Sequence, residues 1–340
     1  MARALRLATY NVEWFDKLFD ADGALLADRG WSGRHDVTRA DQIAALGRVF
    51  CAVDADAFVI IEAPDDSKTR STARALEAFA QRFSLRQRAA IIGFSNHTQQ
   101  EIALLYDPDV IEAAHDPGDS AAAPRFDTQI RLDLDLDDVA EEVRWSKPPL
   151  ELLIRAQARA LEFRLIGVHA KSKAPFGART PEEVMRLSIA NRKKQLAQCI
   201  WLRRRVSARL EAGEALIVAG DFNDGPGLDE YEKLFGRSSV EIVLGQGEEE
   251  RLYDPHASQA LTARFSTPTT SRFWLPHAGR YLQALLDYIM VSDAFRAMQP
   301  RWRIWHPFDD PACFTDHDLR GALLTASDHF PVSLDLVIGS

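Results

Sequence analysis

Ala215-Leu-Ile-Val-Ala-Gly-Asp-Phe-Asn-Asp224 is the stretch that decides the fold of this chain. Its first five residues are apolar without alternation, which is typical of a β-strand covered on both faces. Gly220 ends the apolar run, and Asp221 and Asn223 follow at once. These two polar residues therefore stand at the C-terminal end of a buried strand, the edge at which open α/β sheets usually bind ligands.

Asp221 and Asn223 offer a carboxylate and a neutral amide, and residues two apart on an extended backbone point the same way. Gly225-Pro-Gly227 then closes the stretch as a turn. The same residue types also form simple Asx-type turns, and that interpretation fits the isolated stretch equally well. The rest of the chain must decide between a turn and a functional site.

The composition is that of an ordinary globular protein. Of 340 residues, 46% are hydrophobic and 27% are charged, so a sizeable core can form and wholesale disorder is excluded. We expect a single domain spanning 1–340, with loop insertions near 16–37, 112–146 and 225–280. The net charge of -9 argues against holding nucleic acid by bulk electrostatics but permits a local basic cleft.

The cysteines and the chain start bear on the cellular compartment. Cys51, Cys199 and Cys313 are odd in number and show no spacing typical of a metal site, which indicates a reducing environment. The first strand pattern begins at Leu5 without an apolar signal segment, and no run reaches the roughly 18 apolar residues of a membrane span. We therefore expect a cytoplasmic protein without a membrane span, and the sequence indicates no protein partner.

Other predicted strands also end on polar side chains. The patterns at Leu5–Tyr10, Ala57–Ile61 and Glu162–Val168 predict strands, and Lys171 and Lys173 follow the third. The polar residues at the predicted strand edges are Asn11, Glu62, His169, Asp221 with Asn223, and Asp328 with His329. Each alone is more often a hydrogen-bonded structural residue, but turn chemistry does not produce this whole set.

Helices are predicted between these strands. Thr38 caps the first, and Ser71–Phe83 is amphipathic. Pro181–Arg205 is a longer helix, with Val184 on its apolar side. Its basic cluster, Arg203-Arg-Arg205, fits a surface patch that complements the helix dipole better than a nucleic-acid contact.

The residue types at the strand edges suit one kind of cofactor. Carboxylate and amide oxygens are typical ligands of hard cations such as Mg²⁺ or Mn²⁺. The lack of paired cysteines and of a His-x-x-x-His helix argues against zinc. The two histidines can handle protons or anionic charge.

These motifs, in this order, resemble those of the endonuclease/exonuclease/phosphatase superfamily, which includes pancreatic deoxyribonuclease, exonuclease III-like repair enzymes and neutral sphingomyelinases. The matching stretches are Thr9-Tyr-Asn-Val12, Ile60-Ile-Glu62, Val168-His-Ala-Lys-Ser172, Gly220-Asp-Phe-Asn223, Leu286-Asp-Tyr-Ile289 and Ser327-Asp-His329. The resemblance implies an α/β fold, a four-layer sandwich of two mixed β-sheets packed face to face and flanked by helices. It places the site at the sheet edges.

The resemblance also implies a cation site. Asn11 and Glu62 match metal ligands, and Asp328 matches a further ligand or a charge partner close to the metal. We therefore expect these three residues to hold Mg²⁺ or Mn²⁺.

The catalytic roles follow from the same resemblance. Asp221 matches the carboxylate that positions or deprotonates the attacking water, and Asn223 matches the amide that holds a phosphate oxygen. His169 and His329 match the imidazoles that face the phosphate. Asp287 matches the residue that orients His329.

Some positions depart from the family pattern or stay open. Many relatives have Gln before the metal-binding Glu, whereas this chain has Ile61. Some relatives pair the first histidine with an acid, and Glu101 is the candidate partner of His169. Lys171 and Lys173 fit phosphate contacts and solvated surface lysines equally well.

The leading hypothesis is a divalent-metal-dependent phosphodiesterase, a nuclease that hydrolyses DNA or RNA by in-line attack of water. The alternatives are a phosphatase or phospholipid phosphodiesterase of the same superfamily, or a non-catalytic binding protein on this fold. Ala284–Tyr288 lacks the arginine of inositol-polyphosphate phosphatases, and no exposed apolar helix is predicted that would favour a lipid surface. Arg264, Arg272 and Trp274 are candidates for phosphate contact and base stacking, although packed or surface roles fit them too.

Overall fold

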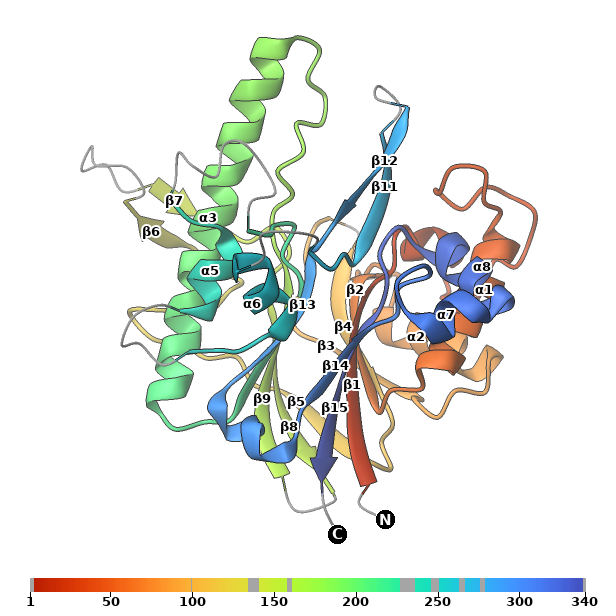
Figure 1. The fold of residues 1–340 in the computed structure, drawn as a ribbon, viewed down its shortest axis with the longest axis horizontal. Helices are drawn as coiled ribbons and strands as arrows, with labels where there is room; N and C mark the ends of the chain where they lie inside the picture. Colours follow the sequence, from red (N-terminus) through yellow and green to blue (C-terminus); the bar gives the residue numbers. More distant parts are fainter. Residues whose placement is uncertain are drawn as a thin grey trace.

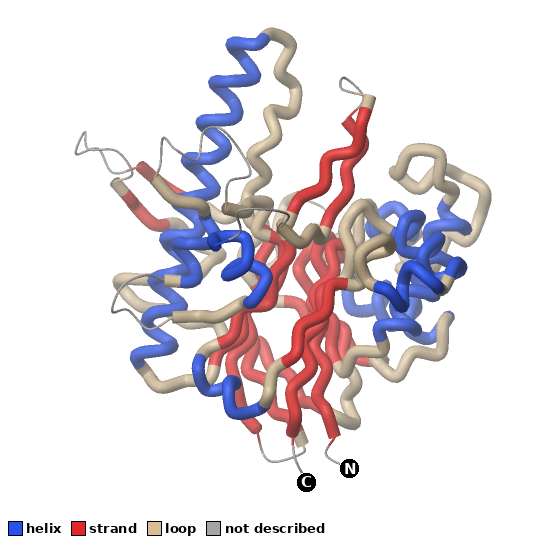
Figure 2. The backbone as a smooth tube through the Cα atoms, viewed as in Figure 1, coloured by secondary structure: helices blue, strands red, loops and turns tan. Residues whose placement is uncertain are grey.

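A computed structural model describes residues 3–98, 100–133, 141–157, 161–226, 236–245, 251–262, 267–275 and 279–338. Two mixed β-sheets stand in its centre, with helices on both outer sides (Figures 1 and 2). The larger sheet has the strand order β14-β15-β1-β2-β4-β3, and the smaller one has β13-β10-β9-β8-β5. Two short hairpins, β11 with β12 and β6 with β7, are separate from both sheets.

The strands predicted at Leu5–Tyr10, Ala57–Ile61 and Glu162–Val168 are present, whereas the segment 112–146, predicted to be a loop insertion, also contains short strands among its described residues. In the larger sheet the strands are β1 (Arg3–Asn11), β2 (Ala57–Ala63), β3 (Ala89–Ile92), β4 (Glu101–Tyr106), β14 (Arg301–Ile304) and β15 (Val332–Ile338). In the smaller sheet they are β5 (Ile111–His115), β8 (Leu150–Ala156), β9 (Leu161–His169), β10 (Leu216–Asp221) and β13 (Asp287–Val291). The hairpins are β6 (Ile130–Leu132) with β7 (Glu141–Val143), and β11 (Ser271–Leu275) with β12 (Arg280–Ala284).

Three apolar layers hold the fold together. Side chains such as Val59 and Ile217 meet between the two sheets. The outer face of the larger sheet packs on α1 (Arg39–Val53), α2 (Thr72–Arg82) and α8 (His317–Ala326). The outer face of the smaller sheet packs on α3 (Pro181–Glu211), α5 (Ser239–Leu244) and α6 (Pro255–Thr262). Both faces of each sheet are thus covered, which confirms the predicted four-layer sandwich.

The helix caps also agree with the sequence prediction. Thr38 accepts a hydrogen bond from the Asp41 backbone at the start of α1, and Ser71 caps α2 in the same way. The remaining helical turns are η1 (Phe15–Leu18), η3 (Asp293–Met298) and α7 (Pro311–Thr315). No helix in the described ranges combines the length and the apolarity needed to cross a membrane.

Strand direction brings the polar strand ends together. β1 runs parallel to β2, so Asn11 pairs with Ile61, the residue before Glu62. β9 runs parallel to β10, so His169 pairs with Asp221. β13 runs antiparallel to β10 and begins at Asp287, which pairs with Asp221. C-terminal ends of parallel strands and the N-terminal end of an antiparallel neighbour share one edge, so all these residues lie at the same end of the sandwich.

Two expectations about the long helix α3 are wrong. Val184 is 40% exposed, because the first turns of α3 project beyond the sheets and have no layer to cover them (Figure 1). Arg203 and Arg205 are buried and form no surface patch. Arg205 forms an ion pair with Glu151 at 2.8 Å, and Arg203 donates to backbone carbonyls at the end of α5.

The segment 225–280, which the sequence predicts to be irregular, contains α5, α6 and β11 among its described residues. The hairpin of β11 and β12 projects from the sandwich on the same side as the first turns of α3 (Figure 1). It is anchored to the segment that carries His329 by two backbone hydrogen bonds of 2.7 Å. The Arg272 N–H donates to the Asp328 carbonyl, and the Phe330 N–H donates to the Thr270 carbonyl. Arg264 lies outside the described residues.

Candidate functional site

Asp221 is the centre of the site. Its side chain is 1% exposed and accepts hydrogen bonds from both strand-end amides. Asn11 Nδ2 donates to Oδ2 at 3.0 Å, Asn223 Nδ2 donates to the same oxygen at 3.0 Å, and the Asn223 backbone donates to Oδ1 at 2.7 Å. The contact from the Asn223 backbone to Asp221 is the one expected of an Asx-type turn. Two side-chain amides bond the same buried carboxylate as well, so the stretch is more than a turn.

The backbone at this edge adopts unusual conformations. Asn223 has φ 50° and Glu62 has φ 62°, values that non-glycine residues rarely adopt and that cluster at functional sites. Glu62 sits in a β-bulge between Ile61 and Ala63, which turns its side chain out of the regular alternation. Gly220 has φ 143°, and a Cβ there would lie 2.0 Å from the Val168 carbonyl oxygen, so only glycine fits.

Both predicted histidines aim their Nε2 atoms at one oxygen. His169 Nε2 lies 3.8 Å from Asp221 Oδ2, and His329 Nε2 lies 4.0 Å from it. These separations are too long for hydrogen bonds. The two ring nitrogens thus face the same buried carboxylate oxygen without hydrogen bonding to it.

The two imidazoles have opposite electrostatic surroundings. His329 Nδ1 lies 2.7 Å from Asp287 Oδ2. Burial lowers the pKa of His329, but the facing carboxylates of Asp287 and Asp221 outweigh it and leave the pKa well above its usual value. His169 is also buried, and burial together with the Lys147 ammonium places its pKa well below the usual value. The site therefore holds one imidazole that favours the charged form and one that favours the neutral form.

A second group of carboxylates lies beside Asn11. Burial raises the pKa of Asp328 to about 7, and nearby Glu13 adds to the rise. Burial also raises the pKa of Glu62, to which Glu13 again contributes. Arg34 forms an ion pair with Glu13. Glu13 thus disfavours the charge of both Glu62 and Asp328, while it pairs with Arg34 itself.

This geometry can be compared with known proteins. The model of the Endonuclease/Exonuclease/phosphatase family matches residues 8–329. The chain belongs to this family. Its members are generally hydrolases of phosphoesters that depend on divalent metals. No curated protein matches the chain in sequence.

Solved structures share the family fold at low sequence identity. The catalytic domain of human Nocturnin is 15% identical over 98% of this chain and 93% of that chain, with a TM-score of 0.50. TDP2 from C. elegans is 13% identical over 98% of this chain and 75% of that chain, with a TM-score of 0.52. At such identities the likeness shows the fold alone.

The residues present fit the divalent cation that the family uses. Asn11 Oδ1 is buried and has no hydrogen-bond partner among the described residues, although Nδ2 of the same amide is bonded. A buried acceptor without a partner is costly, and a cation would satisfy it. Glu62 and Asp328 supply carboxylates whose charge burial disfavours. A tighter group is formed by Asp221, Asp287 and His329, with ligand-type atoms within 4.8 Å of one another, but Asp287 and His329 already bond each other.

Sequence reasoning missed Glu13 and Lys147. Glu13 had a signal, since it lies two residues after Asn11, in the turn that follows the first strand. Lys147 had none, because it follows a weakly patterned insertion. The expected pairing of His169 with Glu101 is wrong: Glu101 accepts from the Asn96 side chain at 2.7 Å, and the atom beside His169 Nδ1 is Lys147 Nζ, at 3.1 Å.

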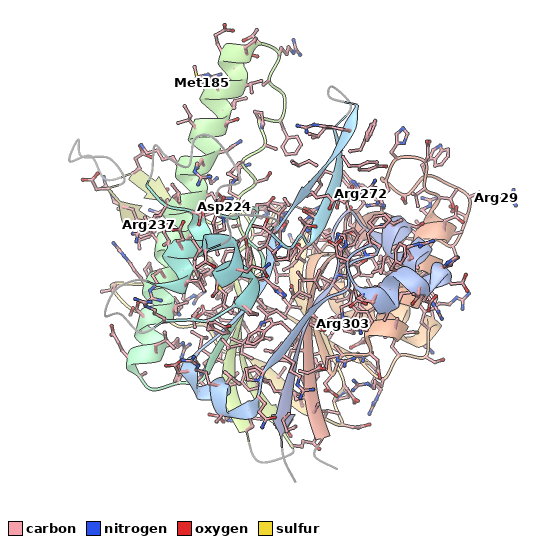
Figure 3. The ribbon with its side chains drawn as sticks, in the orientation of Figure 1. Arg29, Met185, Asp224, Arg237, Arg272 and Arg303 are labelled. Carbon is pink, nitrogen blue, oxygen red and sulfur yellow. The ribbon has the colours of Figure 1, made fainter. Side chains whose placement is uncertain are left out.

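The two candidate phosphate lysines differ. Lys173 forms an ion pair with buried Asp224 behind Asn223. The Lys171 backbone donates to Gln198 Oε1 at 3.0 Å, and burial lowers the pKa of its ammonium. The structure thus ties Lys173 to the scaffold and leaves Lys171 as the better candidate for phosphate contact. Figure 3 shows Met185 near the outer end of α3 and Arg272 by the β11–β12 hairpin, with Asp224 lower in the view.

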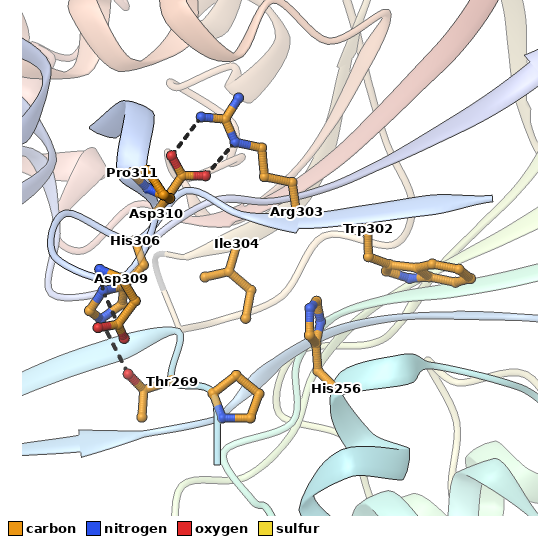
Figure 4. Close-up of a pocket in the computed structure, with 10 residues that line it drawn as sticks. His256, Thr269, Trp302, Arg303, Ile304, His306, Asp309, Asp310 and Pro311 are labelled. Atoms are coloured by element: carbon orange, nitrogen blue, oxygen red, sulfur yellow. Dashed lines mark hydrogen bonds and ion pairs between the residues drawn. The ribbon is translucent and has the colours of Figure 1, made fainter. Parts of the chain in front are cut away.

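A cavity of about 290 Å³ lies apart from this site, between β14 and the start of α6 (Figure 4). None of its lining residues is a predicted site residue; they are His256, Pro268, Thr269, Trp302, Arg303, Ile304, His306, Asp309, Asp310 and Pro311. Arg303 and Asp310 pair with each other at 2.7 Å, and Thr269 Oγ1 lies 3.2 Å from His306 Nε2.

Cation binding is expected to stabilise the protein in a pH-dependent way. The Asp328 carboxyl has a pKa of about 7, so protons compete with the cation below that pH and the carboxylate is available above it. At a hundredfold excess over Kd, Mg²⁺ should add about 2.7 kcal/mol. Thermal unfolding with and without Mg²⁺ at pH 8 and pH 5.5 measures this. If Mg²⁺ raised the Tm equally at both pH values, or raised it undiminished in Glu62→Gln, the assignment would be contradicted. Asp335→Asn is the control for removal of a carboxylate outside the site.

Proposed function

We propose that this protein is a divalent-metal-dependent phosphodiesterase that hydrolyses DNA or RNA by in-line attack of water. The observation that carries the proposal is the convergence of both imidazole Nε2 atoms on Asp221 Oδ2, at 3.8 and 4.0 Å. A carboxylate that accepts a proton from water and two rings that face a phosphate need this arrangement. Family membership supports phosphoester hydrolysis in general.

Asp221 is proposed to orient and deprotonate the water. Burial raises its pKa to about 7, which makes the carboxylate a better proton acceptor near neutral pH than an exposed aspartate. Asn11 and Asn223 hold its two oxygens in place. The water oxygen attacks phosphorus, its proton passes to Asp221, and the opposite P–O bond breaks with the electron pair leaving on the alcohol oxygen.

The other residues are proposed to offset the charge that develops on phosphate. The His329 imidazolium, held by Asp287, faces Asp221. Asn223 Nδ2 donates one hydrogen to Asp221 and one to the Ala170 carbonyl, so it must release one of these bonds to hold a phosphate oxygen. The cation, which Asn11, Glu62 and Asp328 would hold, supplies further positive charge for the phosphate oxygens.

The β11–β12 hairpin supports nucleic acid as the substrate. The Phe273 ring on this hairpin packs against the His329 ring, with 5.4 Å between the ring centres, so the hairpin reaches the site itself. On the other face of the hairpin, the Arg272 guanidinium stacks 3.2 Å from the Tyr281 ring centre, and Trp274 beside it is 51% exposed. Exposed aromatic rings next to an arginine are suited to stack bases and contact the sugar-phosphate backbone.

A phospholipid phosphodiesterase is the second candidate, and a specific observation favours it. Apolar side chains are exposed on both projections beside the site: Phe176 (80%), Val184 (40%) and Met185 (49%) near the start of α3, and Trp274 (51%) and Leu282 (39%) on the hairpin. The sequence predicted no such exposed helix. An apolar surface around a phosphoester site would also suit a lipid interface.

The two candidates predict different results in one assay. The protein is incubated with single- and double-stranded DNA and RNA, with sphingomyelin and phosphatidylcholine vesicles, and with a phosphate monoester, in Mg²⁺ or Mn²⁺. We expect cleavage of nucleic acid that chelation abolishes and that weakens as salt rises, because phosphate contacts are lost. Trp274→Ala should raise KM for nucleic acid, and Phe314→Ala, at an aromatic residue of similar exposure on α7, is the matched aromatic control. Cleavage of vesicle lipid without nucleic acid cleavage would establish the second candidate instead.

A further inference from the structure

Lys147 connects the proposed cation ligands to His169. It lies in the loop before β8, with Nζ 2.6 Å from Gln100 Oε1 and 3.1 Å from His169 Nδ1. Gln100 Nε2 in turn donates to Glu62 Oε2 at 2.7 Å. The Gln100 amide can satisfy Glu62 only with its nitrogen, so its oxygen must be the atom that faces Lys147. The chain of contacts therefore runs from Glu62 through Gln100 and Lys147 to His169.

The chemistry of this contact determines where the His169 proton lies. An ammonium group has donors and no lone pair, so a lysine that bonds a ring nitrogen requires that nitrogen to be unprotonated. With Nδ1 acting as acceptor, the single ring proton of His169 must lie on Nε2, which faces Asp221. Burial, Lys147, the charge of His329 and Lys171 all act against a second proton on the ring.

The other imidazole of the site provides an internal contrast. His329 Nδ1 bonds the Asp287 carboxylate, a partner that requires a proton on Nδ1 and stabilises the imidazolium. His169 has a cation at the same ring position. The two rings face the same Asp221 oxygen, yet their Nδ1 partners carry opposite charges.

We propose that Lys147 is a positioning residue that holds His169 neutral with its hydrogen on Nε2, so that His169 donates a hydrogen bond to a phosphate oxygen and does not act as a general acid. The catalytic part of this inference rests on the proposed function. The protonation state itself does not, because it follows from the contacts of the protein alone.

Nitrogen NMR of the imidazole rings tests the protonation state without substrate. The chain has nine histidines, and His169→Gln identifies the His169 signals. In the wild-type protein we expect one neutral tautomer, with hydrogen on Nε2, from pH 5.5 to 8.5. Lys147→Met should release the ring into a tautomer mixture that titrates in this range, and Lys147→Arg should retain the single tautomer.

The controls decide between this effect and a general disturbance. Lys193 pairs with Glu141 on the surface of α3, and Lys193→Met should leave the His169 signals unchanged. A His169 ring that titrates near 6.5 in the wild-type protein, or signals that Lys147→Met does not alter, would overturn the proposal. Both results are read from the wild-type protein or a folded variant, whether or not any substrate is cleaved.

Turnover then tests the donor role. Gln places an N–H near the position of Nε2 but cannot transfer a proton, so His169→Gln should retain on the order of tenfold more turnover than His169→Ala, the worth of one hydrogen bond to a charged oxygen. Equal losses in the two variants would overturn the donor role. If the wild-type protein cleaves no phosphoester at all, the proposed function fails while the NMR result for Lys147 stands.

Discussion

Replacing Asp221 by Asn is expected to lower turnover about 10³-fold, within the range of a lost general base. The amide cannot accept the water proton. Its N–H₂ group must also replace either Oδ2, which accepts from the Asn11 and Asn223 side chains, or Oδ1, which accepts from the Asn223 backbone, so at least one donor loses its acceptor. Because the interaction is made with the reacting water, the loss should fall mainly on kcat and leave KM little changed.

The experiment needs a control for the loss of a buried carboxylate. Asp254 is fully buried, and burial raises its pKa to about 7. Its carboxylate accepts hydrogen bonds from the Ala257 backbone at the start of α6 and from the Ile289 backbone in β13. Asp254→Asn should therefore lower thermal stability without a comparable loss of turnover. Asp221→Asn with near wild-type kcat in a folded sample would remove Asp221 from the proposed mechanism.

Replacing His329 by Ala is expected to lower turnover by 10²-fold to about 10⁴-fold, because the imidazolium is the charged donor closest to the phosphate position. Asp287→Asn tests how that charge is maintained. The Asp287 carboxylate raises the pKa of His329, and without it the imidazolium should lose its proton at lower pH. The alkaline limb of the pH-rate profile should therefore move to lower pH in Asp287→Asn.

The same linkage predicts a stability effect with a definite sign. The pKa of His329 is raised in the folded state, so its ion pair with Asp287 contributes stability fully below about pH 6.5, the unfolded value. That contribution is lost as pH rises through the folded pKa. Asp287→Asn should thus destabilise the protein more at pH 6 than at alkaline pH.

The measurements are kcat against pH and thermal unfolding against pH for both variants. His317→Ala, at an exposed histidine at the start of α8, is the control. A large rate loss in Asp287→Asn with an unmoved alkaline limb would mean that Asp287 supports the local fold and not the charge of His329. Thr270 Oγ1 also donates to Asp287 Oδ2 at 2.7 Å, so such a structural role has a plausible origin.

Strands and helices of this fold could be predicted from the sequence because burial leaves a local trace. The run before Gly220 is apolar at every position, as β10 is covered on both faces. Thr38 and Ser71 mark where α1 and α2 begin, since a cap side chain bonds the first turn of its own helix. Such signals depend on neighbours within a few residues.

The polar strand ends could be predicted for a related reason. Each of Asn11, Glu62, His169 and Asp221 lies at the C-terminal end of a strand, and parallel strands deliver their ends to one edge. The resemblance to a known family then suggested their roles. The expectation did not depend on any contact between the strands being known beforehand.

Contacts between distant segments were decided only by the tertiary structure. Lys147 and His169 meet because β8 and β9 are neighbours in one sheet, and the Gln100 contact comes from β4 in the other sheet. Glu101, which the sequence suggested in place of Lys147, bonds the nearby Asn96. The sequence by itself determined the strands and the polar residues at their ends, because these follow from local burial, whereas the layers were predicted through the family resemblance. Which charged side chain lies beside each imidazole depends on how the two sheets pack. A shift of one residue in strand register would place a different side chain there.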